Sequence, residues 1–212
     1  MVKLPIEPDL ERLRGLSPSL IQIPSGTILH RVYRRGGEHP TVWNTFRHFG
    51  PSAARFDHHV RNDEGRPQMQ DRGIFYAATD IITAIAEAFQ NKRTVNRIIN
   101  QPWLVSYALA TGLTLLDLSD TFPVKAGGSM KLVSGASLYA QNWSRGFYDC
   151  YPEIHGIYYP SSLTNRPVVA VYERVASLNP FPLTPQFHRA LRDALLIEPT
   201  RNACKDIGYD FL

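Results

Sequence analysis

The chain is poor in cysteine, with only Cys150 and Cys204 among 212 residues. Two cysteines are too few for a disulfide framework or a thiolate zinc site, so we expect inert thiols and no redox chemistry. Long apolar runs are also missing. No stretch approaches the roughly 18 residues that cross a bilayer, and the first ten residues carry three charges where a signal peptide needs an apolar segment. These absences predict a soluble, cytoplasmic protein with no membrane partner.

Basic residues are present but not concentrated. The 23 Lys and Arg against 19 Asp and Glu give a net charge of +4, and no basic block is longer than Arg34-Arg35. Proteins dedicated to nucleic acids usually gather their positive charge into a patch. Scattered arginines favour an anionic small ligand instead, and we expect no direct contact with nucleic acid.

Familiar metal and phosphate motifs are missing as well. His48, His155 and the pair His58-His59 form no H-E-x-x-H or comparable spacing, so we interpret them as loop and surface histidines and predict no metal site. No glycine-rich phosphate fingerprint follows a strand, and strands and helices do not alternate strictly. Both observations favour an α+β fold over a doubly wound parallel sheet.

The remaining pattern predicts one globular domain, because 43% hydrophobic residues can supply a sizeable core. We place it at residues 26–212, after an N-terminal extension at residues 1–25, with mixed or antiparallel sheets flanked by helices. Residue periodicity predicts strands at 27–33, 73–77, 103–110, 113–118, 156–159 and 168–172, and helices at 80–92, 137–147 and 186–197. The strands at 103–110 and 113–118 are expected to pair with each other across a short turn. Glycines predict a mobile loop near 127–135, and residues 43–70 are interpreted as a long functional loop with one extended stretch at 54–56.

The most informative stretch joins a strand to a helix. It reads Gly73-Ile74-Phe75-Tyr76-Ala77-Ala78-Thr79-Asp80, and Thr79 or Asp80 is a good N-cap for the helix that follows. Glu87 comes eleven residues after Tyr76 and falls opposite the apolar face of that helix. A tyrosine at a strand end and a carboxylate two turns into the next helix are thus predicted to face one cleft.

Other segments supply partners for this pair. They are His30-Arg31-Val32-Tyr33, Ala54-Arg55-Phe56-Asp57 and Gly156-Ile157-Tyr158-Tyr159-Pro160-Ser161-Ser162. In this order the arginines, tyrosine, glutamate and serine resemble the RES domain family, the toxins of RES-Xre toxin–antitoxin pairs. The resemblance runs from about residue 26 to about residue 172, which is most of the chain.

The resemblance implies an ADP-ribosyltransferase-like fold and an activity. RES proteins use NAD as a substrate, so it implies cleavage of the bond between nicotinamide and ribose, without a bound cofactor. The matching positions imply two groups of site residues: catalytic Glu87, Arg31 and Ser161, and substrate-binding Arg55, Tyr76 and Tyr33. Ser162, in the same turn as Ser161, stays an alternative for the site serine.

The chemistry of that reaction suits these residue types. A carboxylate can stabilise the positive charge that develops on the ribose as nicotinamide leaves, the role expected for Glu87. Guanidinium groups bind phosphate oxygens in a fork, the role expected for Arg31 and Arg55. Tyr76 is expected to stack on a flat ligand ring, and Ser161 to donate a hydrogen bond to ribose or phosphate.

The acceptor of ADP-ribose and the protein partner are less determined. Hydrolysis with water or phosphorolysis with inorganic phosphate is favoured, modification of a target protein comes second, and a non-catalytic nucleotide-binding domain is a further alternative. The resemblance also implies a cognate antitoxin that blocks the pocket, without showing where it binds. Arg55 and Tyr76 are 21 positions apart, and the charged segment 61–72 between them is interpreted as a lid or a partner surface.

Overall fold

A computed structural model of the protein describes residues 5–212. Its helices are α1 (Leu10–Arg14), α2 (Ile81–Phe89), α3 (Phe122–Lys125), α4 (Lys131–Ser134), α5 (Ser137–Cys150) and α6 (Ile197–Ile207), with 3₁₀ helices η1 (Glu173–Leu178) and η2 (Ala194–Leu196). Its strands are β1 (Leu20–Ile23), β2 (Ile28–Arg34), β3 (Arg47–Gly50), β4 (Gln68–Ala78), β5 (Thr94–Val95), β6 (Pro102–Ala108), β7 (Leu113–Asp117), β8 (Gly156–Pro160), β9 (Pro167–Tyr172), β10 (Phe187–Ala190) and β11 (Asp210–Phe211). The predicted α+β class, a mixed sheet flanked by helices, is confirmed.

One nine-stranded sheet organises the molecule. Its order is β1-β7-β8-β9-β4-β2-β6-β10, with β3 paired to β4, and β5 and β11 form a separate parallel pair. Within the large sheet β7 and β8 run parallel, whereas the other neighbours are antiparallel. Strand β2 pairs with β6 along its whole length but with β4 only at His30 and Ala78. The sheet therefore opens between β2 and β4, and its two halves diverge from that point.

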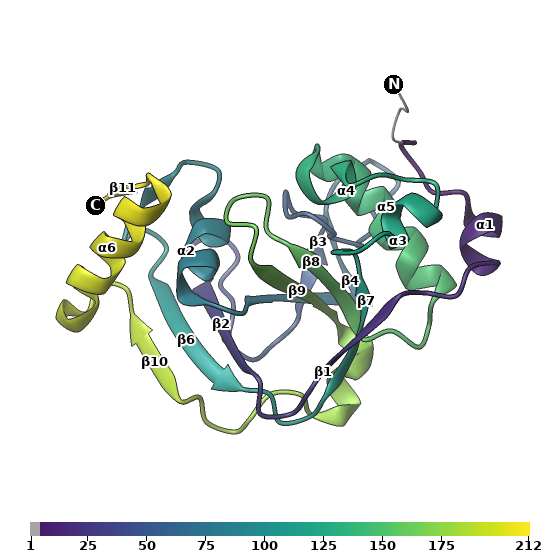
Figure 1. Ribbon diagram of the computed structural model, residues 1–212. Helices are drawn as coiled ribbons and strands as arrows, with labels where there is room; N and C mark the ends of the chain where they lie inside the picture. The colour runs from purple at the N-terminus through teal and green to yellow at the C-terminus, as the bar shows by residue number, and fades with distance from the viewer. Residues whose placement is uncertain (1–4) are drawn as a thin grey trace.

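Each half of the sheet has its own helices. Figure 1 shows α2 and α6 beside the half with β2, β6 and β10, and α1, α3, α4 and α5 beside the half with β1, β7 and β8. Ile85 of α2, Cys204 of α6 and Leu104 of β6 belong to one buried cluster, while Trp143 of α5 and Ile157 of β8 belong to another. These two clusters leave the opening between β2 and β4 free for a cavity, whereas a third cluster, with Leu29 of β2 and Phe75 of β4, joins the two halves on the other face of the sheet.

Residues 5–25, the described part of the expected extension, contribute to this architecture. Helix α1 lies against α5, and Leu13 of α1 is fully buried in the same cluster as Trp143. Strand β1 pairs with β7 from Leu20 to Ile23 and forms one edge of the sheet.

The predicted hairpin of residues 103–110 and 113–118 is wrong. Both strands exist, as β6 and β7, but β6 pairs with β2 and β10, whereas β7 pairs with β1 and β8. The connection between them crosses from one half of the sheet to the other. Two strands joined by a short turn have the sequence pattern of a hairpin. The local sequence does not show that each strand pairs with strands distant in the chain.

Three further local predictions differ from the structure. Residues 186–197 form strand β10 and η2 instead of a helix, because edge pairing with β6 overrides the helical spacing, and the last helix begins at Ile197. Residues 54–56 form a turn, and the extended stretch of that loop is β3, residues 47–50. The predicted mobile loop near 127–135 contains the short helix α4 and follows α3.

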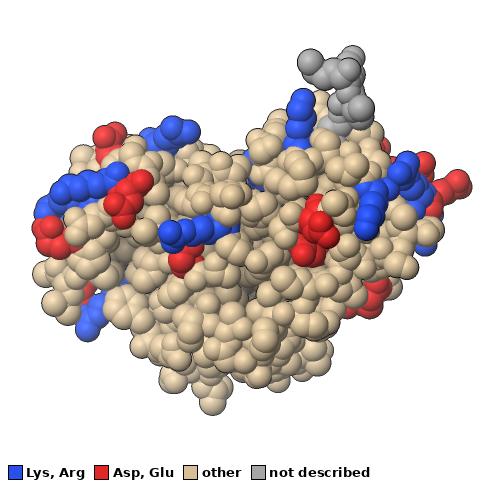
Figure 2. All heavy atoms as spheres, in the orientation of Figure 1, with Lys and Arg blue, Asp and Glu red and all other residues tan. Residues whose placement is uncertain are grey.

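Charge is spread over the surface. Figure 2 shows Lys and Arg side chains separated on this face by uncharged surface and interspersed with acidic ones. Among residues 5–212, no helix is both long and apolar enough to span a bilayer.

Candidate functional site

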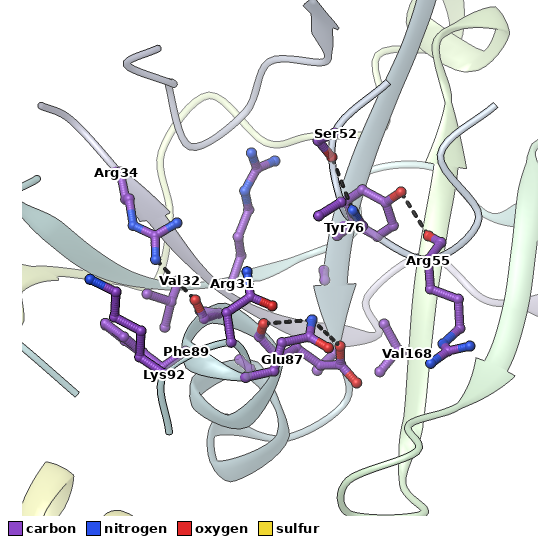
Figure 3. Close-up of a pocket in the computed structure, with 18 of the residues that line it drawn as sticks. Arg31, Val32, Arg34, Ser52, Arg55, Tyr76, Glu87, Phe89, Lys92 and Val168 are labelled. Carbon is purple, nitrogen blue, oxygen red and sulfur yellow. Dashed lines mark hydrogen bonds between the residues drawn. The ribbon is translucent and has the colours of Figure 1, made fainter. Parts of the chain in front are cut away.

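A cavity of about 490 Å³ lies where β2 and β4 separate. Four parts of the fold line it: β2, the loop after β3, the end of β4, and α2 with the segment that follows α2. Tyr159 of β8 and Val168 of β9 complete the wall. Figure 3 shows Arg31, Arg55, Tyr76 and Glu87 around this space. This volume lies within the range of sites that hold small molecules and cofactors.

Helix α2 presents Glu87 to the cavity. Asp80 caps its first turn by accepting a hydrogen bond from the Thr83 amide at 2.9 Å, as the sequence predicts. Ile85 and Phe89 are buried on the side that packs against β6 and α6, so Glu87 lies away from this apolar face. Burial raises the pKa of Glu87 above its ordinary value, while hydrogen bonding to Ser161 and the charge of Arg55 oppose that shift. The site thus holds a partly desolvated carboxylate beside a cation.

Ser161 contacts this carboxylate directly. Its hydroxyl Oγ donates to Oε1 of Glu87 at 2.6 Å, and this Ser161 Oγ also accepts from the Leu163 amide at 3.1 Å. Ser161 lies in the turn between β8 and β9 and is 2% exposed, whereas Ser162 is exposed. Of the two serines in the turn, the structure brings Ser161 to Glu87.

Arg31 is buried without an anionic partner. It is 9% exposed, and burial lowers its pKa to about 10. The guanidinium lies 4.0 Å from the centre of the Phe75 ring, and its Nη1 has no hydrogen-bond partner in the described part of the chain. The buried hydroxyl of Tyr107, which interacts electrostatically with Arg31, lacks a partner too. A buried arginine that borders a cavity and is left unpaired is suited to an anionic ligand.

Arg55 and Tyr76 are linked to each other. The Tyr76 hydroxyl donates to the backbone carbonyl of Arg55 at 2.9 Å, and the Arg55 guanidinium donates to the Gly135 carbonyl at 2.6 Å. Both residues line the cavity, and Figure 3 shows the Arg55 side chain extending past Val168. The hydroxyl of Tyr76 is therefore engaged by the protein, while its ring faces the ligand space.

Tyr33 is not brought to this site. It lies on the opposite face of β2 from Val32, is 4% exposed, and its hydroxyl hydrogen-bonds to Nε2 of His188 at 2.6 Å. Tyr33 is not among the residues that line the cavity. Leu29, Arg31 and Tyr33 share one face of β2, where Leu29 and Tyr33 pack into the core. Arg31 nevertheless borders the cavity, because it lies next to His30, where β2 and β4 separate.

Much of the cavity lining lies outside the residues predicted from the sequence. The additional residues include His30, Arg34, Tyr159, Asn91, Lys92, Asn96 and Asn100. Tyr159 lies near both Glu87 and Arg55 and is almost fully buried. The residues after α2 give no periodic signal, and only their closeness to Glu87 in sequence marks them. With these residues included, four cations and one carboxylate, Glu87, line the cavity.

The paired histidines were also misjudged. His58 and His59 are fully buried, not on the surface, and Nδ1 of His59 contacts Oδ1 of Asp57 at 2.5 Å. Burial lowers the pKa of His58 to about 4, so it is neutral near pH 7. Among residues 5–212, no group of three or more His, Cys, Asp or Glu side chains is arranged to hold a metal ion.

The contact between Ser161 and Glu87 predicts a change in pH dependence. Replacing Ser161 with Ala removes a hydrogen bond that favours the charged carboxylate, so the pKa of Glu87 rises further. If Glu87 acts in its charged form, the acid limb of the rate profile then moves to higher pH, by up to about one unit. The rate of Ser161→Ala measured from pH 4 to 8 checks this, with Ser162→Ala as the matched control that leaves the limb in place. An unshifted limb in Ser161→Ala would show that the hydrogen bond does not tune Glu87.

Comparisons with known proteins agree with this geometry. The RES domain family matches residues 28–192. Among solved structures, a chain of the M. tuberculosis MbcT-MbcA toxin-antitoxin complex superposes with a TM-score of 0.55 and 15% identity, covering 89% of this chain and 94% of that chain. No curated protein sequence matches significantly. The match to solved structures shows the fold, which is consistent with the expected ADP-ribosyltransferase-like architecture. The family match spans more than half of the sequence and includes every residue discussed around the cavity, and so the chain belongs to the RES domain family.

Proposed function

We propose that the protein is an NAD-degrading toxin that cleaves the bond between nicotinamide and ribose, by hydrolysis or phosphorolysis. The observation that carries the proposal is the charge arrangement of the cavity. One partly desolvated carboxylate, Glu87, faces a space otherwise lined by cations and neutral groups. A dinucleotide with an anionic pyrophosphate and a ribose that becomes cationic in the transition state matches this arrangement.

Glu87 would act on the ribose. When the C1′–N bond breaks, its electron pair leaves with nicotinamide, whose ring nitrogen becomes neutral, and positive charge develops on the ribose. A carboxylate near that ribose stabilises the charge, and fixed charges in a partly dry site do so more strongly than in water. Water or phosphate then adds at C1′, and addition of water releases a proton. The Ser161 hydroxyl holds one oxygen of Glu87 and so limits how the carboxylate can turn.

The arginines would hold the pyrophosphate. Arg31 has an unused buried donor, and Arg55 has one guanidinium nitrogen bound to the Gly135 carbonyl and faces the cavity with the rest. Neither forms an ion pair with a carboxylate in residues 5–212. Fixing the substrate by its phosphates places the scissile bond, a contribution that can reach several kcal/mol. NAD serves as substrate in this scheme, and no cofactor takes part.

A protein antitoxin is the proposed partner. The structural neighbour was solved as a toxin-antitoxin complex, and we extend that kind of partnership to this chain. Expression of the chain alone is then toxic to bacteria, and a cognate antitoxin relieves the toxicity.

The fate of labelled NAD tests the proposal against its alternatives. Incubation of purified protein with NAD that carries label in the adenylate part is expected to give free nicotinamide and a small labelled product. Label bound to protein, in a cell lysate, would point to modification of a target protein. NAD that binds without being consumed would point to a nucleotide-binding domain, and either result would contradict the proposal.

A further inference from the structure

The segment that carries Arg55 has no regular structure, yet it is held at nearly every carbonyl. Residues 52–56 lie in a turn between β3 and β4. Side chains from outside donate to four of its five backbone carbonyls: Gln141 to Ser52 at 2.8 Å and to Ala54 at 2.9 Å, Tyr76 to Arg55 at 2.9 Å, and Ser144 to Phe56 at 2.8 Å. Irregular backbone keeps one conformation only when such bonds define it.

A buried carboxylate, that of Asp57, binds the backbone amide at the start of the same segment. Asp57 is fully buried and accepts from the Ser52 amide at 2.6 Å, from the Ser52 hydroxyl at 2.9 Å and from Arg47 at 2.8 Å. Burial raises the pKa of Asp57, but the hydrogen bond with His59 and the charge of Arg47 outweigh burial and hold it well below its usual range. Asp57 is therefore charged at neutral pH and keeps the turn closed.

Gln141 is the contact that joins this turn to another element. It lies on α5, is 6% exposed, and its one amide nitrogen bridges two carbonyls on the N-terminal side of Arg55. The Arg55 side chain also reaches towards this helix, because its guanidinium donates to the Gly135 carbonyl just before α5. Gln141 of α5 thus holds the backbone beside Arg55, and the segment between α4 and α5 binds its charged end.

We propose that Gln141 is a positioning residue that sets the place of Arg55 in the cavity. The inference rests on the proposed function, since it concerns how well Arg55 meets a bound phosphate. Gln141 does not line the cavity and does not touch the ligand space. It acts through the Ser52–Ala54 backbone, and small displacements of a substrate-binding group are costly in rate.

The test compares two buried amides on the same helix. Gln141→Leu removes the bridge to the turn. Asn142→Leu removes a bond to the Ile6 carbonyl, 3.1 Å long, and the acceptor of a hydrogen bond from Arg145, and neither bond involves Arg55. We expect kcat/KM for NAD to fall about 10-fold in Gln141→Leu, mostly through KM, and less than about 2-fold in Asn142→Leu. Ser144→Ala is a smaller change that also loosens the turn, and it should weaken activity in the same direction if Gln141→Leu folds poorly.

A double-mutant cycle separates positioning from general damage. In an Arg55→Ala background, Gln141→Leu should cost less than about 2-fold further, because a residue that acts through Arg55 has nothing left to position. An equal loss in both backgrounds, or an equal loss from Gln141→Leu and Asn142→Leu, would overturn the proposal.

Two readouts do not depend on NAD cleavage. Amide hydrogen exchange across residues 52–58 should accelerate in Gln141→Leu and not in Asn142→Leu, and unchanged exchange would overturn the proposal by itself. Growth arrest on expression should weaken in Gln141→Leu and not in Asn142→Leu. If wild-type protein arrests growth without consuming NAD, the proposed function fails, while the exchange and growth readouts still decide the role of Gln141.

Discussion

Glu87→Gln should lower the rate of nicotinamide release by about 10²- to 10³-fold, the range found when one electrostatic stabiliser of a transition state is removed. The substitution keeps the size and most of the hydrogen bonding of the side chain, including an acceptor for the Ser161 hydroxyl. It removes only the negative charge. Because burial already disfavours that charge, the variant should fold at least as stably as the wild type. Steady-state release of nicotinamide and thermal unfolding, measured on the same preparation, check both parts.

The matched control is Glu198→Gln on α6. Glu198 is exposed and pairs with Arg201 on the same helix, away from the cavity, so full activity is expected. NAD should still bind to Glu87→Gln, because its phosphate-binding arginines are intact. A rate in Glu87→Gln close to that of the wild type would remove Glu87 from the mechanism.

Arg31→Met should leave the protein at least as stable as the wild type and much less active. Arg31 bears the cost of burying a charge without an ion-pair partner in residues 5–212, and methionine keeps the apolar stem over Phe75. The loss of the cation–π contact, about 1–2 kcal/mol, offsets part of the gain. We expect a thermal midpoint equal to or above that of the wild type and a fall in kcat/KM for NAD of about 100-fold, the loss of a charged contact to phosphate.

Arg47→Met supplies the contrast. Arg47 pairs with the buried Asp57 at 2.8 Å, so its removal takes away the arginine partner of a buried carboxylate and should destabilise the fold by about 2 kcal/mol or more. Arg47→Met is therefore expected to lower the thermal midpoint, and Arg31→Met is not. A clear drop for Arg31→Met, comparable to that of Arg47→Met, would mean that Arg31 serves the fold and not a ligand.

The sequence predicted local elements better than their pairing. The C-terminal part of β4, helix α2 and the turn between β8 and β9 lie where their patterns indicate, because each depends on nearby residues such as the Asp80 cap, whereas the first residues of β4, from Gln68, fall in the predicted loop. The pairing of β6 and β7 was wrong because both strands find partners far away in the sequence. Helical spacing in residues 186–197 likewise gave way to an edge strand on β6.

The site residues likewise divide into those that the sequence predicts and those that depend on tertiary contacts. The family resemblance placed Glu87, Ser161, Arg31, Arg55 and Tyr76, and all five line or adjoin one cavity. Tyr33 was included as a neighbour of Arg31, yet it packs into the core and its hydroxyl hydrogen-bonds to His188. Gln141 could not be predicted, because a glutamine in a helix has no distinctive sequence pattern. Its role depends on its bonds to the distant carbonyls of Ser52 and Ala54.

Nicotinamide release from NAD by the purified wild-type protein, with and without phosphate and with products resolved by mass, tests the central claim most directly. The account predicts steady release, with free ADP-ribose in the absence of phosphate if water is the acceptor, or a phosphorylated ADP-ribose only in its presence if phosphate is. Folded protein, free of bound inhibitor, that releases no nicotinamide in either buffer would contradict it.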